Sequence, residues 1–391
     1  MRLSSLFAAL LALTPTSLFA AQCGGDFNAF LNGIKAEAIA SGHSRQSVNQ
    51  FLKTAAIDPA VLRADKAQGV FKMAFSDFAG RVIRKDRMVN GEKNAKKYAA
   101  VFKRAQQTYG VDPSVILAFW ALETDYGAVQ GDFNTLNALL TLSHDCRRPE
   151  LFRPQIFAAL ELYKQGDFDP ARTLGAWAGE IGMVQMLPDD ILHRGVDGDG
   201  DGHVTLKTSA PDAIMTAANM LQSLGWRANE PWLVEVSVPK NLDWTQTGLE
   251  TEKSVADWAR LGVKAKHGDL PANQLNASIL LPEGRFGPVF MVLPNYRVYF
   301  EWNQSFVYVT TAAYFATRLD GAPVFDKGNP EPSLSDADMR SLQTKLAARG
   351  HDVGKIDGIL GSGTRGAVRA EQTRLGLPTD GWPNRALLNA L

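Results

Sequence analysis

The chain has 391 residues, of which 45% are apolar and 21% are charged. This length is enough for one large hydrophobic core and a second, smaller module. Lysine plus arginine and aspartate plus glutamate number 41 each, so the formal net charge is zero. Without a net charge no long-range field attracts nucleic acid or anionic lipid, so we expect no nucleic-acid partner and favour a neutral or mixed-charge polymer.

The N-terminal segment has the composition of an export signal. Arg2 supplies a positive charge, residues 6–13 form an apolar run, and Phe19-Ala20-Ala21 gives a small-residue end. We therefore predict a signal peptide over residues 1–20 and a periplasmic location.

The sequence contains two cysteines, Cys23 and Cys146. An oxidising compartment favours a disulfide between them, although two free thiols remain the alternative because sequence gives no distance. Gln22 stands where a lipid-attachment signal has a small residue, so we expect no lipid anchor at Cys23.

The periodicity of the chain is mainly helical. Residues 26–104 carry apolar side chains three and four positions apart, which is typical of amphipathic helices. β-Branched and aromatic residues cluster at 232–238 and again at 289–300, which predicts a small sheet or hairpin between helices. The predicted fold class is mainly α, with a minor β component (α+β).

The chain divides into a main domain and a tail. We predict a main domain over residues 21–325, a polar linker at 326–333 with the sequence DKGNPEPS, and a C-terminal module over 334–391. The module is long enough for three helices but not for a deep cleft. Its expected core residues are Leu342, Leu346, Val368 and Leu375.

One helix carries a candidate catalytic acid. Asp112 is a good N-cap, and Pro113 at the first helical position lacks an N–H that would in any case be unpaired. The sequence SVILAFWALETDYG follows, with Gly127 as a possible helix end. One face of this helix holds Ile116, Phe119, Trp120 and Glu123.

Apolar surroundings favour the neutral form of the Glu123 carboxyl group and raise its pKa, which makes it a proton donor. The alternative is a glutamate at the rim of a helix in a salt bridge. Asp125 lies about 200° around the helix from Glu123, so we expect it to be a structural partner and not a second catalytic acid.

Four motifs in order, ALETDYG, SHDCRR followed by FRPQIFAAL, GEIGMVQMLP and WNQSFVYVTTAAYFATRL, resemble the membrane-bound lytic transglycosylase B family, glycoside hydrolase family 103. The resemblance covers about residues 24–322. It implies a lysozyme-like catalytic domain that cleaves peptidoglycan glycan strands and needs no cofactor for the chemistry. The resemblance makes Glu123 the acid and base, and the implied substrate-binding residues are Gly182, Gln185, Trp302, Asn303 and Tyr308.

Three positions depart from the family pattern: Ala176 in place of a serine, Trp302 in place of a frequent tyrosine, and the additional acid Glu180. They put details of the substrate subsites in doubt. For Gln185 and Asn303 the alternative is ordinary backbone capping.

A single catalytic carboxylate predicts a reaction without water, because hydrolysis needs a second carboxylate. The product would be a 1,6-anhydro sugar. A hydrolytic muramidase becomes the better interpretation if Asp132 or Glu180 faces Glu123. The alternative that is not an enzyme is a non-catalytic scaffold that binds the cell wall.

A monomer is expected, with cell-wall synthesis proteins as possible partners.

The loop DGDGDGHVT has acids at EF-hand positions 1, 3 and 5 and glycine at position 6, but Thr208 replaces the glutamate of position 12. We predict a structural Ca²⁺ site, against the alternative of solvated turn residues. Its candidate ligands are Asp197, Asp199, Asp201, the carbonyl of His203, and Asp212.

The tail LQTKLAARGHDVGKIDGILGSGTRGAVRAEQTRLGLPTDG resembles the small peptidoglycan-binding domain. Such a module raises the local concentration of an insoluble polymer. We expect it to be separable, so that removing residues 326–391 weakens binding to cell-wall sacculi and spares turnover of soluble fragments.

Overall fold

The computed structural model describes residues 23–67 and 73–391, so the predicted signal peptide lies outside the described residues. The helices are α1 (Phe27–Ala40), α2 (Arg45–Phe51), α3 (Pro59–Lys66), α4 (Phe75–Val82), α5 (Lys85–Lys97), α6 (Ala99–Tyr109), α7 (Pro113–Thr124), α8 (Thr135–His144), α9 (Pro149–Gln165), α10 (Pro188–Arg194), α11 (Ala210–Ser223), α12 (Val255–Arg260), α13 (Pro294–Trp302), α14 (Phe306–Leu319), α15 (Asp336–Ala348), α16 (Ser362–Arg374) and α17 (Arg385–Ala390). The strands are β1 (Phe133–Asn134), β2 (Leu174–Gly175), β3 (Leu233–Ser237), β4 (Lys253–Ser254), β5 (Lys264–Ala265), β6 (Asn276–Leu280) and β7 (Phe290–Val292). The predicted class, mainly α with a small sheet, is confirmed.

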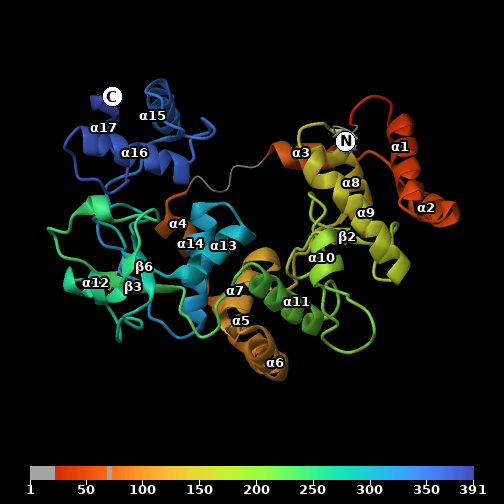
Figure 1. Ribbon diagram of the computed structural model, residues 1–391, viewed down its shortest axis with the longest axis horizontal. Helices are drawn as coiled ribbons and strands as arrows, with labels where there is room; N and C mark the ends of the chain where they lie inside the picture. The colour runs from red at the N-terminus through yellow and green to blue at the C-terminus, as the bar shows by residue number, and fades with distance from the viewer. Residues whose placement is uncertain (1–22, 68–72) are drawn as a thin grey trace, which may run out of the picture.

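The helices of the main domain form two groups that share one hydrophobic core. Helices α1 to α3 pack with α8, α9 and α10, and helices α4 to α7 pack with α13 and α14. Helix α11 contacts both groups through α10, α6 and α7. Figure 1 shows the first group at the right, α13 and α14 near the centre, and the C-terminal helices in blue at the upper left.

Helix α7 lies at the centre of the second group and is buried on nearly every side, from Ser114 to Ala121. Its start is the predicted one, because the Asp112 carboxylate accepts the N–H of Ser114 at 2.8 Å and Pro113 opens the helix. A helix that is apolar all round belongs in a core. Glu123 therefore extends from one of the most enclosed elements of the protein.

The larger sheet is antiparallel in the order β4-β6-β7-β3-β5 and has its own core with α12, centred on Trp258 and Met291. Register pairs Leu233 with Val292. The prediction of extended structure through residue 300 was wrong in its second half. The strand ends at Val292, and Pro294 begins helix α13, where its missing N–H carries no penalty.

A disulfide joins the N-terminal end of the described chain to the turn between α8 and α9. Cys23 and Cys146 are bonded with their Cα atoms 5.2 Å apart, and both are therefore paired. Among the described residues, no helix combines the length and apolar composition that crossing a bilayer requires.

The C-terminal module consists of α15, α16 and α17 around a core of its own. Leu342, Leu346 and Val368 are fully buried there, and Leu375 packs at its edge. Residues 326–333 have no regular secondary structure, but they are held in place, since the Asp326 carboxylate pairs with Lys266 at 2.7 Å.

Candidate active site

The end of α7 fixes the position of Glu123. The helix stops at Thr124 and not at Gly127, because Asp125 (φ 51°) and Tyr126 (φ 60°) already have left-handed backbone. Arg87 of α5 secures this turn, since its Nε donates to the Asp125 carboxylate at 3.1 Å and its carbonyl accepts the Tyr126 hydroxyl at 2.9 Å. Asp125 is thus a structural partner, as expected, although it follows the end of the helix and does not lie on it.

Two donors from separate helices meet the Glu123 carboxyl group. The indole N–H of Trp302, at the end of α13, donates to Oε1 at 3.0 Å. The hydroxyl of Tyr308, in the first turn of α14, donates to the same oxygen. Within the described part of the chain, Oε2 has no hydrogen-bond partner, and the Glu123 side chain is only partly exposed. One oxygen is therefore anchored while the other is free to meet a ligand.

Aromatic packing holds these donors in place. The Trp302 ring stacks on Phe119 of α7 at a centroid distance of 4.2 Å, and Phe119 also stacks on Tyr299 at 5.0 Å. Phe119 lies four residues before Glu123, on the same face of the helix. The apolar face that the sequence predicted for Glu123 is thus the surface on which α13 packs.

This environment raises the pKa of Glu123 to about 7, mainly because burial disfavours the carboxylate. The hydrogen bonds from Tyr308 and Trp302 lower the pKa, and the negative charge of Glu180 raises it further. A carboxyl group with a pKa near neutrality can donate a proton and take one back at working pH, which is what general acid–base catalysis needs.

The glycine-rich loop between β2 and Met186 packs against the end of α7. The Thr124 hydroxyl donates to the Met183 carbonyl at 2.6 Å, and a bridge pairs Ile181 with Met186. Gly182 has φ +80° and lies so close to Leu206 that an added Cβ would come within 2.5 Å of it. Gly182 therefore shapes the loop through its lack of a side chain.

Glu180 projects from this loop, and its charge acts on Glu123. Among the residues that the structure describes, its Oε2 is buried without a hydrogen-bond partner. Burial raises the pKa of Glu180, and backbone hydrogen bonds and the charge of Arg148 partly offset this rise. Asp132, the other rival acid, is exposed. Of the two candidates for a second carboxylate, only Glu180 contributes to the electrostatics of Glu123.

Gln185 and Asn303 make backbone-capping hydrogen bonds. The Gln185 amide donates to the Gly182 carbonyl at 2.8 Å and to the Gln130 carbonyl at 3.4 Å. The side-chain Oδ1 of Asn303 accepts the N–H of Ser305 at 2.9 Å, in the break between α13 and α14. Both side chains therefore shape segments next to Glu123, and a role in binding sugar stays a prediction.

The acidic loop brings together only part of the predicted ligand set. Asp197, Asp199 and Asp212 each place an oxygen within 4.8 Å of the others. Asp201 instead accepts the N–H of His203 at 2.8 Å, and the His203 ring contacts Asp167 at 2.7 Å. Three carboxylates this close form an all-oxygen set that suits Ca²⁺.

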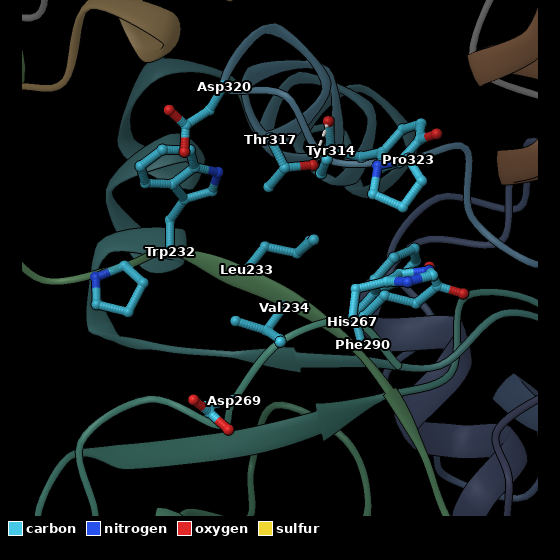
Figure 2. A pocket seen from close by; sticks show the side chains of 14 residues that line it. Trp232, Leu233, Val234, His267, Asp269, Phe290, Tyr314, Thr317, Asp320 and Pro323 are labelled. Atoms are coloured by element: carbon cyan, nitrogen blue, oxygen red, sulfur yellow. Dashed lines mark hydrogen bonds and ion pairs between the residues drawn. The ribbon is translucent and has the colours of Figure 1, made fainter. Parts of the chain in front are cut away.

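A separate cavity of about 360 Å³ lies at the other end of α14, between that helix and β3. Figure 2 shows Tyr314, Thr317 and Asp320 on one wall, Trp232 to Val234 on another, and Asp269 opposite. Glu123 is not among its lining residues. The cavity is therefore distinct from the acid site.

Residues 26–317 match the family model described as the transglycosylase SLT domain, and residues 335–391 match the putative peptidoglycan binding domain. Since the first match covers most of the chain, the protein belongs to the SLT-domain transglycosylase family. Its fold is the lysozyme-like fold of lytic transglycosylases, with a peptidoglycan-binding domain at the C-terminus.

Individual relatives agree with this assignment. The chain is 29% identical over 298 residues to the membrane-bound lytic murein transglycosylase B of Escherichia coli. The matched region covers 73% of this chain and 81% of that protein. It resembles SltB3 of Pseudomonas aeruginosa, solved with NAG-anhNAM-pentapeptide, with a TM-score of 0.85 and 34% identity over 94% of this chain and 99% of SltB3. It also resembles Escherichia coli Slt35, solved with calcium, with a TM-score of 0.65 and 28% identity over 77% of this chain and 96% of Slt35.

Both Trp302 and Tyr308 donate to the same carboxylate oxygen, which the sequence does not show. The family resemblance implies only a substrate-binding role for each. Their separation of six residues does not fit one helical face, and only the break at Asn303 and Ser305 turns the two side chains toward each other. The signal was the capping pattern Asn-Gln-Ser, which predicts a helix end followed by a new helix start.

Proposed function

We propose that this protein is a lytic transglycosylase that cleaves the β-1,4 bond between N-acetylmuramoyl and N-acetylglucosaminyl residues of peptidoglycan, with Glu123 as its acid and base. The observation that carries the proposal is a half-buried carboxyl group whose pKa is raised to about 7 and whose Oε1 is fixed by Trp302 and Tyr308. Family membership and the ligand-bound relative SltB3 support the substrate class.

The reaction proceeds in two steps, and all atoms of the product come from the glycan. Protonated Glu123 gives its proton to the glycosidic oxygen as the bond from that oxygen to C1 of the muramoyl residue breaks, with assistance from the N-acetyl group. The C6 hydroxyl of the same residue then forms a bond to C1 and returns its proton to Glu123. The free Oε2 is the atom available for both transfers, because Oε1 already accepts two hydrogen bonds.

The product distinguishes this reaction from hydrolysis. Digestion of sacculi in water enriched in ¹⁸O should give muropeptides with 1,6-anhydro ends, one water lighter than hydrolytic products and free of ¹⁸O. Hydrated, labelled ends would identify a muramidase instead.

Glu180 is the residue on which that alternative depends, because its charge acts on Glu123. We expect Glu180→Gln to keep the anhydro product, since the second step uses a substrate hydroxyl and no activated water. Loss of a hydrated product in this variant would show that Glu180 activates water.

We further propose that the acidic loop binds a structural Ca²⁺ ion. Asp197, Asp199 and Asp212 supply the carboxylates, and Slt35 provides a relative solved with calcium. A buried Asp212 already ties the loop together by accepting the N–H groups of Gly198 at 2.8 Å and Thr205 at 2.7 Å. The ion would neutralise the clustered charge and hold the loop in shape, with no part in proton transfer.

Calcium should raise the unfolding temperature of the apoprotein, because a ligand that binds only the folded state stabilises it. Asp199→Asn should remove this rise. Asp201→Asn is the matched control, since Asp201 lies in the same loop but outside the cluster, and it should keep the rise. An equal loss in both variants would favour an EF-hand arrangement over the three-carboxylate site.

The proposal also includes a wall-binding role for the C-terminal domain and an exported location for the protein. The module over residues 334–391 would hold the enzyme on the insoluble wall. A periplasmic location agrees with the bonded pair Cys23 and Cys146, because disulfides persist in oxidising compartments.

A further inference from the structure

The C-terminal module docks on the main domain through a buried arginine. Arg365 of α16 lies over the Phe306 ring at 4.2 Å from its centroid and is 5.8 Å from the centroid of Trp382. Its Nη2 donates to the Pro282 carbonyl at 2.6 Å, just after β6. One guanidinium group therefore joins the module, the sheet and the start of α14.

Further polar contacts join the module to the main domain and to the linker. Arg369, one turn along α16, donates to the Trp244 carbonyl at 2.9 Å. Asp380 pairs with Arg285 of the main domain at 3.1 Å, and the Trp382 indole donates to the Glu331 carbonyl of the linker at 3.0 Å. A module attached at so many points is not a freely moving tether.

The docked surface includes the helix turn that carries Tyr308. Phe306 and Val307, the first two residues of α14, are only 5% and 7% exposed. Val307 lines a small cavity together with Met339 and Leu360 of the module. The next residue is Tyr308, whose hydroxyl binds Glu123. A continuous path of contacts thus runs from Arg365 to the proposed catalytic acid.

We propose that Arg365 is a positioning residue, which braces the first turn of α14 so that Tyr308 reaches Glu123. This inference rests on the proposed function of Glu123. The planar guanidinium can stack on Phe306 while it donates to backbone carbonyls, and a lysine cannot do both. The peptidoglycan-binding module is then part of the catalytic structure, in contrast to the separable tail that the sequence alone suggested.

The test compares Arg365→Ala and Arg365→Lys with the wild type on a soluble glycan fragment, which does not need the module for capture. Arg374→Ala is the matched control, because Arg374 is exposed on the same helix and, within the described residues, its ion pair is with Glu371 at 2.7 Å. Arg365→Ala should lower kcat about tenfold to a hundredfold with little change in KM, since small misplacements of catalytic groups have effects of this size. Arg365→Lys should recover part of the loss.

A readout of the Glu123 environment separates positioning from simple destabilisation. Glu123 is faced by Tyr308 from α14, Trp302 from α13 and Glu180 from the glycine-rich loop. Because the Tyr308 hydrogen bond lowers the pKa of Glu123, its loss in Arg365→Ala should shift the fall in activity at alkaline pH to a higher pH. Binding to sacculi should remain as in the wild type, which shows that the module is folded.

An unshifted pH profile in Arg365→Ala would overturn the proposal. This holds if kcat equals that of the wild type, and also if kcat decreases only in proportion to the fraction of folded protein. A wild type without activity on the soluble fragment would instead contradict the proposed function itself. Thermal unfolding of all variants supplies the folded fraction in each case.

Discussion

Replacing Glu123 by glutamine should abolish glycan cleavage and leave the fold intact. The amide oxygen can still accept from Trp302 and Tyr308, but an amide cannot give or take the proton of the reaction. Loss of general acid–base catalysis reduces rates by about 10²–10⁴-fold, so activity should fall at least this far. Turnover of soluble fragments and release of muropeptides from sacculi measure the effect.

Glu92→Gln is the control for this substitution, because Glu92 is an exposed glutamate on α5. It should behave as the wild type. Residual activity near the wild-type level in Glu123→Gln would contradict the assignment of the acid.

The same variant has a stability signature. In the folded protein the pKa of Glu123 is raised from 4.5 to about 7, so the folded state holds this proton more tightly than the unfolded chain. The wild type should therefore lose stability relative to Glu123→Gln as the pH rises from about 4.5 to about 7, and the difference should then level off. Unfolding temperatures across this range measure the trend.

Tyr308→Phe should change both the rate and its pH dependence. The variant removes one of the two donors to Glu123 Oε1, so the pKa of Glu123 should rise above about 7 and activity should persist to higher pH. The rate should fall about tenfold to a hundredfold, because a hydrogen bond to a charged group contributes about 1.5–3 kcal/mol and the anchored geometry is lost. Initial rates from pH 5 to about 9 test this expectation.

Trp302→Phe removes the other donor and should shift the profile in the same direction. Tyr314→Phe is the matched control, since Tyr314 lies on the same helix and its hydroxyl accepts the N–H of Phe325 at 3.2 Å, away from Glu123. If Tyr308→Phe and Tyr314→Phe had the same profile, the Tyr308 hydrogen bond would have no influence on the acid.

The sequence was sufficient for the local parts of this structure. The cap at Asp112 and Pro113 predicted the start of α7, and the apolar face of α7 predicted a raised pKa for Glu123. The residues from which these two features were predicted lie within a few turns of each other. The strand at Phe290 was also predicted from neighbouring residues. The β-branched and aromatic residues after Pro294 form a helix instead, because the position of the proline outweighs β propensity there.

What the sequence could not give were contacts between distant segments. Trp302 and Tyr308 reach Glu123 across 179 and 185 residues, and Arg365 reaches the carbonyl of Pro282 across 83 residues. No local spacing encodes such pairings. The acidic loop shows the same limit, since its sequence follows an EF-hand while the geometry gathers Asp197 and Asp199 with Asp212 and leaves out Asp201.

The proposed reaction requires that the Glu123 carboxyl group stays protonated up to neutral pH. Titration of this group by carbon-13 NMR, assigned by comparison with Glu123→Gln, tests it directly. The expected pKa of Glu123 is about 7. A midpoint near the ordinary glutamate pKa of 4.5 would contradict it, because the carboxylate would then have no proton to give at the working pH.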